Sequence, residues 1–167
     1  MSEHSPNPVA GKESIARFVF SPLHITKNGK IKPSLFSHVD DQGCSVQRES
    51  IATDPEVSAF VRGFLEAASN REWLGVAFAF CRDIRLMPAP DRDKKRAVCL
   101  YDTAEPANPA HAEICRARHF EDADPLELRR ELLRLFGDGQ IVDRKAYRAG
   151  GVWNALSQGL RDRVATR

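Results

Sequence analysis

The chain has 167 residues, of which 42% are hydrophobic and 29% are charged, and its formal net charge is +2. This size suits one globular domain, and the small net charge argues against indiscriminate binding of nucleic acid by the chain as a whole. The most apolar run, WLGVAFAF at 73–80, is too short to cross a bilayer, so we expect no membrane contact.

The N-terminal segment differs in composition from the rest of the chain. Residues 1–14 are polar and rich in Pro, Gly and Ser, which predicts a flexible arm before a single α+β domain over residues 15–167. The arm lacks the apolar stretch of an export signal. The cysteines have no C-x-x-C spacing: Cys44, Cys81, Cys99 and Cys115. These features predict reduced thiols and a cytoplasmic location.

The first part of the domain contains two β-prone stretches. Residues 15–36 begin with an apolar run and contain Asn28-Gly29, a pair that favours a tight turn because both residues tolerate positive φ. We therefore expect a hairpin or a short two-strand excursion over 15–36. Residues 44–51, CSVQRESI, predict a short strand with one mostly polar face.

Residues 53–70 have the pattern of a capped amphipathic helix. Thr53 and Glu56 have the spacing of a capping box, and Pro55 is tolerated in the first helical turn. Apolar residues then recur at helical spacing: Val57, Phe60, Val61, Phe64, Leu65 and Ala68. The pattern predicts a helix that buries this stripe against the core.

Two further strands are expected in the middle of the chain. Large and small apolar residues alternate in VAFAF, which favours a buried strand over 74–81, and RAVCLYD favours a second strand over 96–102. The polar connection between them predicts that the two pair as a central hairpin.

Helical features increase after residue 108. Asn108 followed by Pro109 is a good helix start, so we interpret 108–119 as a helix in preference to a strand. Asp124 and Pro125 start another helix, within a C-terminal helical part of about 124–164. The whole pattern predicts an α+β fold: a small mixed or antiparallel sheet packed by the 53–70 helix, with a helical C-terminal region.

Several ligand types that bind zinc occur close together in the sequence: Cys99, His111, Cys115 and His119. On a helix His111 and His119 would lie about 12 Å apart, and on a strand farther, so one ion could not bind both. The chain also lacks the glycine-rich motifs that bind phosphates. We therefore expect no metal and no cofactor.

If the protein is an enzyme, His24, Arg48 and His111 are the candidate catalytic residues. Two histidines could exchange protons while an arginine stabilises charge on phosphate, as in a metal-independent, ribonuclease-like phosphodiesterase. Alternatively, Arg48, Ser45 and Glu113 could serve a transferase that uses a nucleotide.

Two compact basic segments could contact nucleic acid. Both are short and surrounded by polar residues, and they contribute Lys27, Lys30 and Lys32 from the first, and Arg92, Lys94, Lys95 and Arg96 from the second. Lysines and arginines of this kind neutralise phosphates without reading the base sequence. Aromatic residues suited to base stacking are scarce within these segments.

Three short segments resemble a loosely defined set of small prokaryotic proteins with no assigned activity. The segments are SPLH at 21–24, SVQR at 45–48 and NPAHAEI at 108–114, which correspond to S-P-x-H, S-V-x-R and N-P-A-H-A in that set. The resemblance covers residues 18–118 and implies that His24, Arg48 and His111 belong to one site.

The leading functional hypothesis is a non-enzymatic binding or accessory subunit of a larger bacterial intracellular assembly. It follows from the absence of a complete catalytic motif together with the basic segments, and it implies a protein partner, with RNA or DNA as a further partner. The alternative is the His/Arg phosphodiesterase or the transferase. The sequence does not indicate an oligomeric state.

Overall fold

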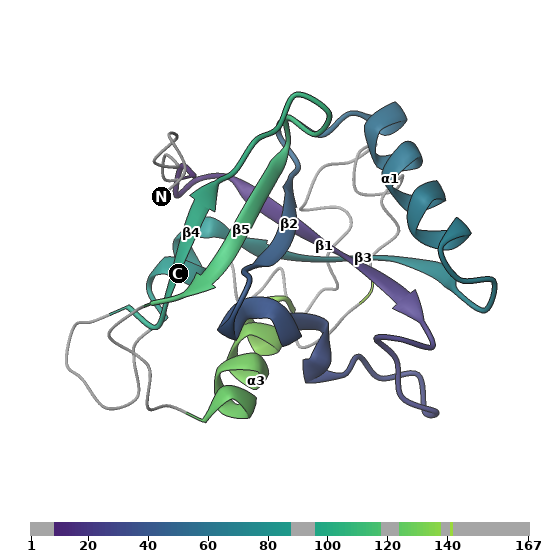
Figure 1. Ribbon diagram of the computed structural model, residues 1–167. Helices are drawn as coiled ribbons and strands as arrows, with labels where there is room; N and C mark the ends of the chain where they lie inside the picture. Colours follow the sequence, from purple (N-terminus) through teal and green to yellow (C-terminus); the bar gives the residue numbers. More distant parts are fainter. Residues whose placement is uncertain (1–8, 88–95, 118–123, 138–140, 142–167) are drawn as a thin grey trace.

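The computed structural model describes residues 9–87, 96–117, 124–137 and 141, and it has an α+β fold (Figure 1). The antiparallel sheet has the strand order β3-β1-β2-β5-β4. The strands are β1 (Ser14–Ser21), β2 (Cys44–Arg48), β3 (Glu72–Phe80), β4 (Val98–Asp102) and β5 (His111–Arg116). The helices are η1 (Pro33–Asp40), α1 (Asp54–Glu66), α2 (Cys81–Arg85) and α3 (Pro125–Leu135). The predicted fold class is confirmed.

Each face of the sheet contributes to a separate core. Ile15 and Val19 point from β1 into the larger core, where η1, α2 and α3 pack, whereas Phe18 and Phe20 point into a smaller core under α1. Alternation along a strand places such neighbours on opposite faces, and it continues through Val19 and Phe20, where the register with β3 shifts by one residue on the β3 side. Figure 1 shows α1 on one side of the sheet and η1 with α3 on the other.

Strands β1 and β2 separate soon after they meet. Their register contains two residue pairs, Ile15 with Arg48 and Ala16 with Gln47. Beyond these pairs the Arg17 guanidinium lies between the strands and donates to the carbonyl of Ser45 at 2.5 Å. The separation leaves an opening in the middle of the sheet that a regular ladder would close.

The two helices expected from capping signals are confirmed in their positions. At the start of α1 the Glu56 carboxylate accepts from the Thr53 backbone N–H at 2.9 Å and from its hydroxyl at 2.7 Å. At the start of α3 the Asp124 carboxylate accepts from the N–H of Leu126 at 2.9 Å. The apolar stripe of α1 is buried less than expected, because Phe60 remains 41% exposed. The C-terminal helical part beyond residue 141 lies outside the described residues.

The expected pairing of 74–81 with 96–102 as a central hairpin is wrong, although both strands exist. β3 pairs with β1 and β4 pairs with β5, so the two strands occupy opposite edges of the sheet. The chain leaves β3 directly into α2, because the N–H groups of Cys81 and Arg82 donate to the carbonyls of Glu13 and Gly11. α2 then carries the chain beneath the sheet towards β4.

The helix expected over 108–119 is also wrong: residues 111–116 form β5. Ala112 and Ile114 are buried on one face of β5, and His111 and Glu113 lie on the other. Ladders with β2 and β4 on both sides outweigh the local helix signal. Asn108 belongs instead to a tight turn, in which it exchanges two backbone hydrogen bonds with Glu105.

The segment between β1 and β2 is partly as expected. Ile25 and Ile31 form a bridge around the Asn28-Gly29 turn, where Gly29 has a φ of 74°, but residues 33–40 form η1 rather than a strand. Residues 9–13, which we assigned to the flexible arm, pack against the domain, and Val9 is buried. None of the described helices is long and apolar enough to cross a bilayer.

Candidate functional site

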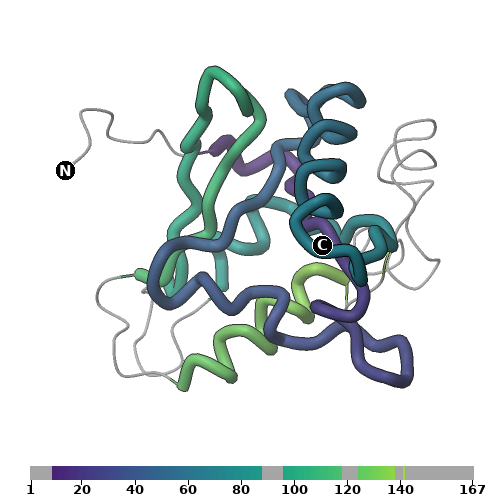
Figure 2. The backbone as a smooth tube through the Cα atoms, turned by 45° about the vertical axis from the view of Figure 1, so that its right-hand side comes forward, coloured from purple at the N-terminus to yellow at the C-terminus, as the bar shows by residue number. Residues whose placement is uncertain are grey.

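A groove of about 640 Å³ lies between α1 and the sheet, where β1 and β2 separate. Its floor comes from β1, β2 and β5, and its wall from α1. The loop after β1 and η1 also line it, and so do Glu105 and Asn108 from the tip of the β4–β5 hairpin. Figure 2 shows this hairpin tip and η1 at opposite ends of β2 and β5. The volume is in the range of ligand sites in proteins.

His24 lines this groove as a buried, neutral side chain. Its Nδ1 accepts from the backbone N–H of Phe20 at 3.1 Å, which requires the proton of the neutral ring to be on Nε2. Burial, assisted by the nearby charges of Arg17, Lys32 and Arg71, lowers the pKa of His24 to about 4. His24 is therefore a fixed hydrogen-bond donor near pH 7.

His111 lines the same groove with the opposite polarity. Its Nδ1 lies 2.8 Å from the hydroxyl of Thr103 and 3.2 Å from the carbonyl oxygen of Thr103. A carbonyl oxygen can only accept, so the second contact favours the tautomer with the proton on Nδ1, in which the hydroxyl of Thr103 also accepts. In the neutral ring the Nε2 of His111 is then an acceptor.

Gln47 on β2 lies next to His111, its register partner on β5. Only 5% of the residue is exposed, and it lines the groove. Its side-chain amide is not among the fully buried polar atoms that lack a partner in the described residues, so water or a ligand in the groove can reach it. The amide can therefore offer a bound ligand one donor and one acceptor.

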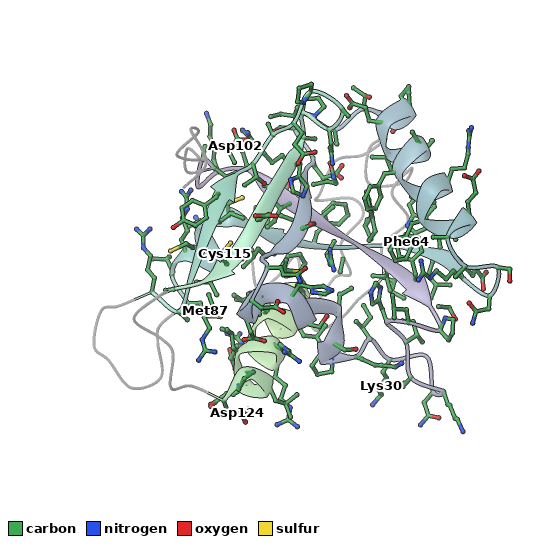
Figure 3. The ribbon with its side chains drawn as sticks, viewed as in Figure 1. Lys30, Phe64, Met87, Asp102, Cys115 and Asp124 are labelled. Atoms are coloured by element: carbon green, nitrogen blue, oxygen red, sulfur yellow. The ribbon has the colours of Figure 1, made fainter. Side chains whose placement is uncertain are left out.

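Aromatic side chains form the wall of the groove. Phe60 lies 5.2 Å from Phe18 between ring centroids, and Phe64 lies 4.3 Å from Phe20. Phe60 and Phe64 are nearly parallel, with an interplanar angle of 14°. Figure 3 shows Phe64 on α1, on the side of the helix that faces the sheet. The wall is apolar, and Phe60 is the exposed ring within it.

The positive charge near the groove comes from Arg17, Lys32 and Arg71. Arg17 is held by the carbonyls of Leu35 and Ser45, and the Arg71 guanidinium lies 4.2 Å above the ring of Phe64. Lys32 donates to two carbonyls in the loop after β1. These cations favour an anionic group at this end of the groove.

Arg48 does not join the two histidines. It makes a two-point contact with Glu13, at 2.8 and 3.0 Å, and a contact of 2.5 Å with Asp102. It is not among the residues that line the groove. Burial opposes ionisation of Glu13, but hydrogen bonds from Arg48, Ala10 and Ser50 outweigh it and hold the pKa of Glu13 below its ordinary value. The geometry indicates that Arg48 attaches residues 10–13 to the sheet.

The transferase residues are similarly divided. Ser45 lines the groove, whereas Glu113, its register partner on β5, does not. Among the described residues, no three metal-binding side chains are grouped closely enough to hold an ion. Cys99 and Cys115 face each other across β4 and β5, and burial raises the pKa of Cys115 to about 11, which makes it a poor nucleophile.

The basic residues expected to contact nucleic acid are only partly described. Lys27 and Lys30 are exposed on the loop after β1, and Lys32 is half-buried. Figure 3 labels Lys30 on this loop. Arg96 is exposed at the start of β4, three strands away from β1. Arg92, Lys94 and Lys95 lie outside the described residues. The described lysines therefore form one basic loop, next to the groove.

Sequence reasoning missed three features of the groove: Arg17, Gln47 and the aromatic wall. The polar face of residues 44–51 was a usable signal for Gln47, because a polar residue between two central strands needs a partner. Arg17, inside an apolar strand, was a second signal. Neither signal identifies the residues that Gln47 and Arg17 contact, because these contacts depend on the order of the strands in the sheet.

Comparisons with protein-family models, with curated proteins and with solved structures find no match.

Proposed function

We propose that the protein is a non-enzymatic accessory subunit that binds single-stranded nucleic acid in the groove. An unpaired base of the strand would enter the groove. The phosphates of the strand would lie along the basic loop that carries Lys27 and Lys30. The observation that carries the proposal is the position of Gln47, whose amide lines the groove together with the aromatic side chains Phe60 and Phe64. Unstacked bases supply both a planar face and a hydrogen-bonding edge.

The aromatic wall supports base binding. Phe60 is 41% exposed although it belongs to the apolar stripe of α1, so its ring is available for stacking. Stacking of a base on such a ring contributes about 1–3 kcal/mol and tolerates any base sequence. Duplex bases are already stacked, which favours single strands.

The charge distribution supports a phosphate backbone beside the groove. Lys27 and Lys30 are exposed on the loop that also carries His24, so a strand that leaves the groove in this direction meets two cations. Leu23, on the same loop, lines the groove and is 46% exposed. The chain as a whole is nearly neutral, so this attraction is local.

The histidines support binding rather than phosphodiester cleavage. A proton-exchanging pair needs two rings that both gain and lose a proton near neutral pH. His24 does not meet this requirement, because its Nδ1 is occupied by Phe20 and burial lowers its pKa to about 4. The expected cation, Arg48, is bound to Glu13 and Asp102.

The proposal is tested by fluorescence anisotropy with short labelled RNA and DNA at low salt, as single strands and as duplexes. We expect single strands to bind more tightly than duplexes. Phe60→Ala should weaken binding about 5- to 100-fold through lost stacking. Leu126→Ala, which removes a similarly exposed apolar side chain from α3, is the matched control and should have no effect.

Two outcomes would contradict the proposal: no binding of any single strand, or equal weakening by both variants. The accessory role has its own test, in which tagged protein is recovered from native lysate and the retained proteins and nucleic acids are identified. Recovery of a monomer alone would exclude that role.

A further inference from the structure

We infer that the groove selects bases with an exocyclic amino group, adenine and cytosine, over bases with a keto group at the same position. This inference rests on the proposed function, because it assigns the base that the site accepts. It follows from the positions of Gln47 and His111 and from the fixed proton position of His111.

Gln47 alone cannot make this selection. Its amide offers one donor and one acceptor, and rotation about the last side-chain bond exchanges them. Adenine and cytosine present an amino donor next to a ring nitrogen acceptor, whereas hypoxanthine and uracil present a keto acceptor next to a ring N–H. One orientation of Gln47 matches the first pair of bases, and the other orientation matches the second pair.

His111 removes this ambiguity. Gln47 and His111 are register partners on adjacent central strands and both line the groove, so their side chains meet the same edge of a bound base. Thr103 holds the proton of His111 on Nδ1, which leaves Nε2 as an acceptor. An amino group can donate one hydrogen to Gln47 and its second hydrogen to His111. A keto oxygen would instead face the lone pair of His111.

The surrounding structure keeps this polarity in place. The backbone of Thr103 also donates to the carbonyl of His111 at 3.3 Å, so the residue that fixes the ring is part of the hairpin. At the far end of the groove His24 is a donor with a fixed proton on Nε2. The groove therefore offers three polar groups: His111 as an acceptor, His24 as a donor, and the Gln47 amide, which can turn to present either polarity.

The test compares labelled single-stranded DNA of two matched pairs, oligo-adenine against oligo-hypoxanthine and oligo-cytosine against oligo-uracil. Each pair exchanges an amino group for a keto group and otherwise keeps the ring. We expect the amino member of each pair to bind about ten-fold more tightly. Agreement between the purine and the pyrimidine pair distinguishes edge recognition from differences in stacking.

His111→Gln tests the assigned residue, because a rotatable amide can present either polarity. In this variant the ratio of the affinity for amino strands to the affinity for keto strands should fall towards one. Binding of the amino strands should persist. His38→Gln is the matched control, since His38 also lines the groove but is exposed on η1, and its ratio should equal that of the unmodified protein.

The outcomes separate the two proposals. Binding of all four strands with ratios near one, or preference for the keto members, overturns the selection and leaves the proposed function standing. Failure of all four strands to bind overturns the proposed function as well. The ratio of amino to keto affinities measured on the unmodified protein tests the inference even if His111→Gln does not fold.

Discussion

The Nδ1 atom of His24 accepts a hydrogen bond from the backbone N–H of Phe20, and this contact lies at the end of β1 where the chain turns into the basic loop. The ring therefore completes the backbone hydrogen bonding of the strand end. It also presents Nε2–H as a donor with fixed geometry at the groove. A residue expected to exchange protons is instead a neutral side chain that completes the hydrogen bonding of a strand end.

The buried state of His24 predicts that the protein loses stability in acid. The unfolded chain protonates His24 near pH 6.5, whereas the folded protein protonates it only near pH 4. Between these values the unfolded state binds more protons, so the contribution of His24 is complete above about pH 6.5 and falls as the pH falls. We expect a loss of about 3 kcal/mol from this group by pH 4, measured by urea unfolding.

His24→Asn is the control for this pH dependence. The carbonyl oxygen of Asn can accept from the N–H of Phe20, as Nδ1 does, but it does not titrate. The variant should therefore show a smaller decrease in unfolding free energy between about pH 7 and about pH 4.5 than the unmodified protein. Equal slopes would contradict the assignment.

Removal of the Arg48 guanidinium should destabilise the fold without weakening nucleic-acid binding. In Arg48→Met, Glu13 and Asp102 lose their cation while partly buried, which should cost about 2–4 kcal/mol in urea unfolding. Glu13→Gln in the same chain should recover part of this loss, because one uncompensated charge is removed. If Arg48→Met left stability unchanged but abolished binding, Arg48 would belong to the site.

The two exposed lysines of the basic loop should determine the salt dependence of binding. Each phosphate contact to a single strand contributes about 0.7 to the slope of log K against log salt. Lys27→Gln with Lys30→Gln should therefore reduce this slope by about 1.4, measured by anisotropy at several salt concentrations. The control pair, Lys12→Gln with Arg130→Gln, removes two exposed cations elsewhere and should leave the slope unchanged.

Two glycines with positive φ should respond differently to alanine. Gly43 has a φ of 88°, and a Cβ there would lie 3.1 Å from both Cys115 Sγ and Glu113 Oε2. Gly29 has a φ of 74° and open space around it. Gly29→Ala should cost about 1–2 kcal/mol from the backbone alone, and Gly43→Ala should cost more because it adds these contacts. Equal losses in thermal or urea unfolding would contradict the packing assigned to Gly43.

Local signals predicted individual elements well. The capping residues Thr53 and Asp124 mark α1 and α3, and the apolar alternation around 74–81 marks β3, because these interactions involve neighbours in sequence. The same reasoning failed for β5. Its helix signals at Asn108 and Pro109 are real in isolation, but pairing with two strands distant in sequence outweighs them.

The candidate site could be predicted only in part for the same reason. His24 and His111 were identified from their surroundings in sequence, and the structure places both on one groove. Arg48 was identified in the same way, but alternation along β2 directs it away from the face that carries Gln47. Strand order, which depends on long-range contacts, decides which of these residues meet.

The short contact between β1 and β2 divides the sheet mechanically. β1 and β3 form one stiff plate, and β2, β5 and β4 form a second, joined at two residue pairs. The two plates are held together mainly by side chains, because one apolar core takes Ile15 and Val19 from the first and Val46 and Ile114 from the second. A base bound between Gln47 and Phe60 of α1, which contacts Phe18 on β1, would add a further connection between the two plates.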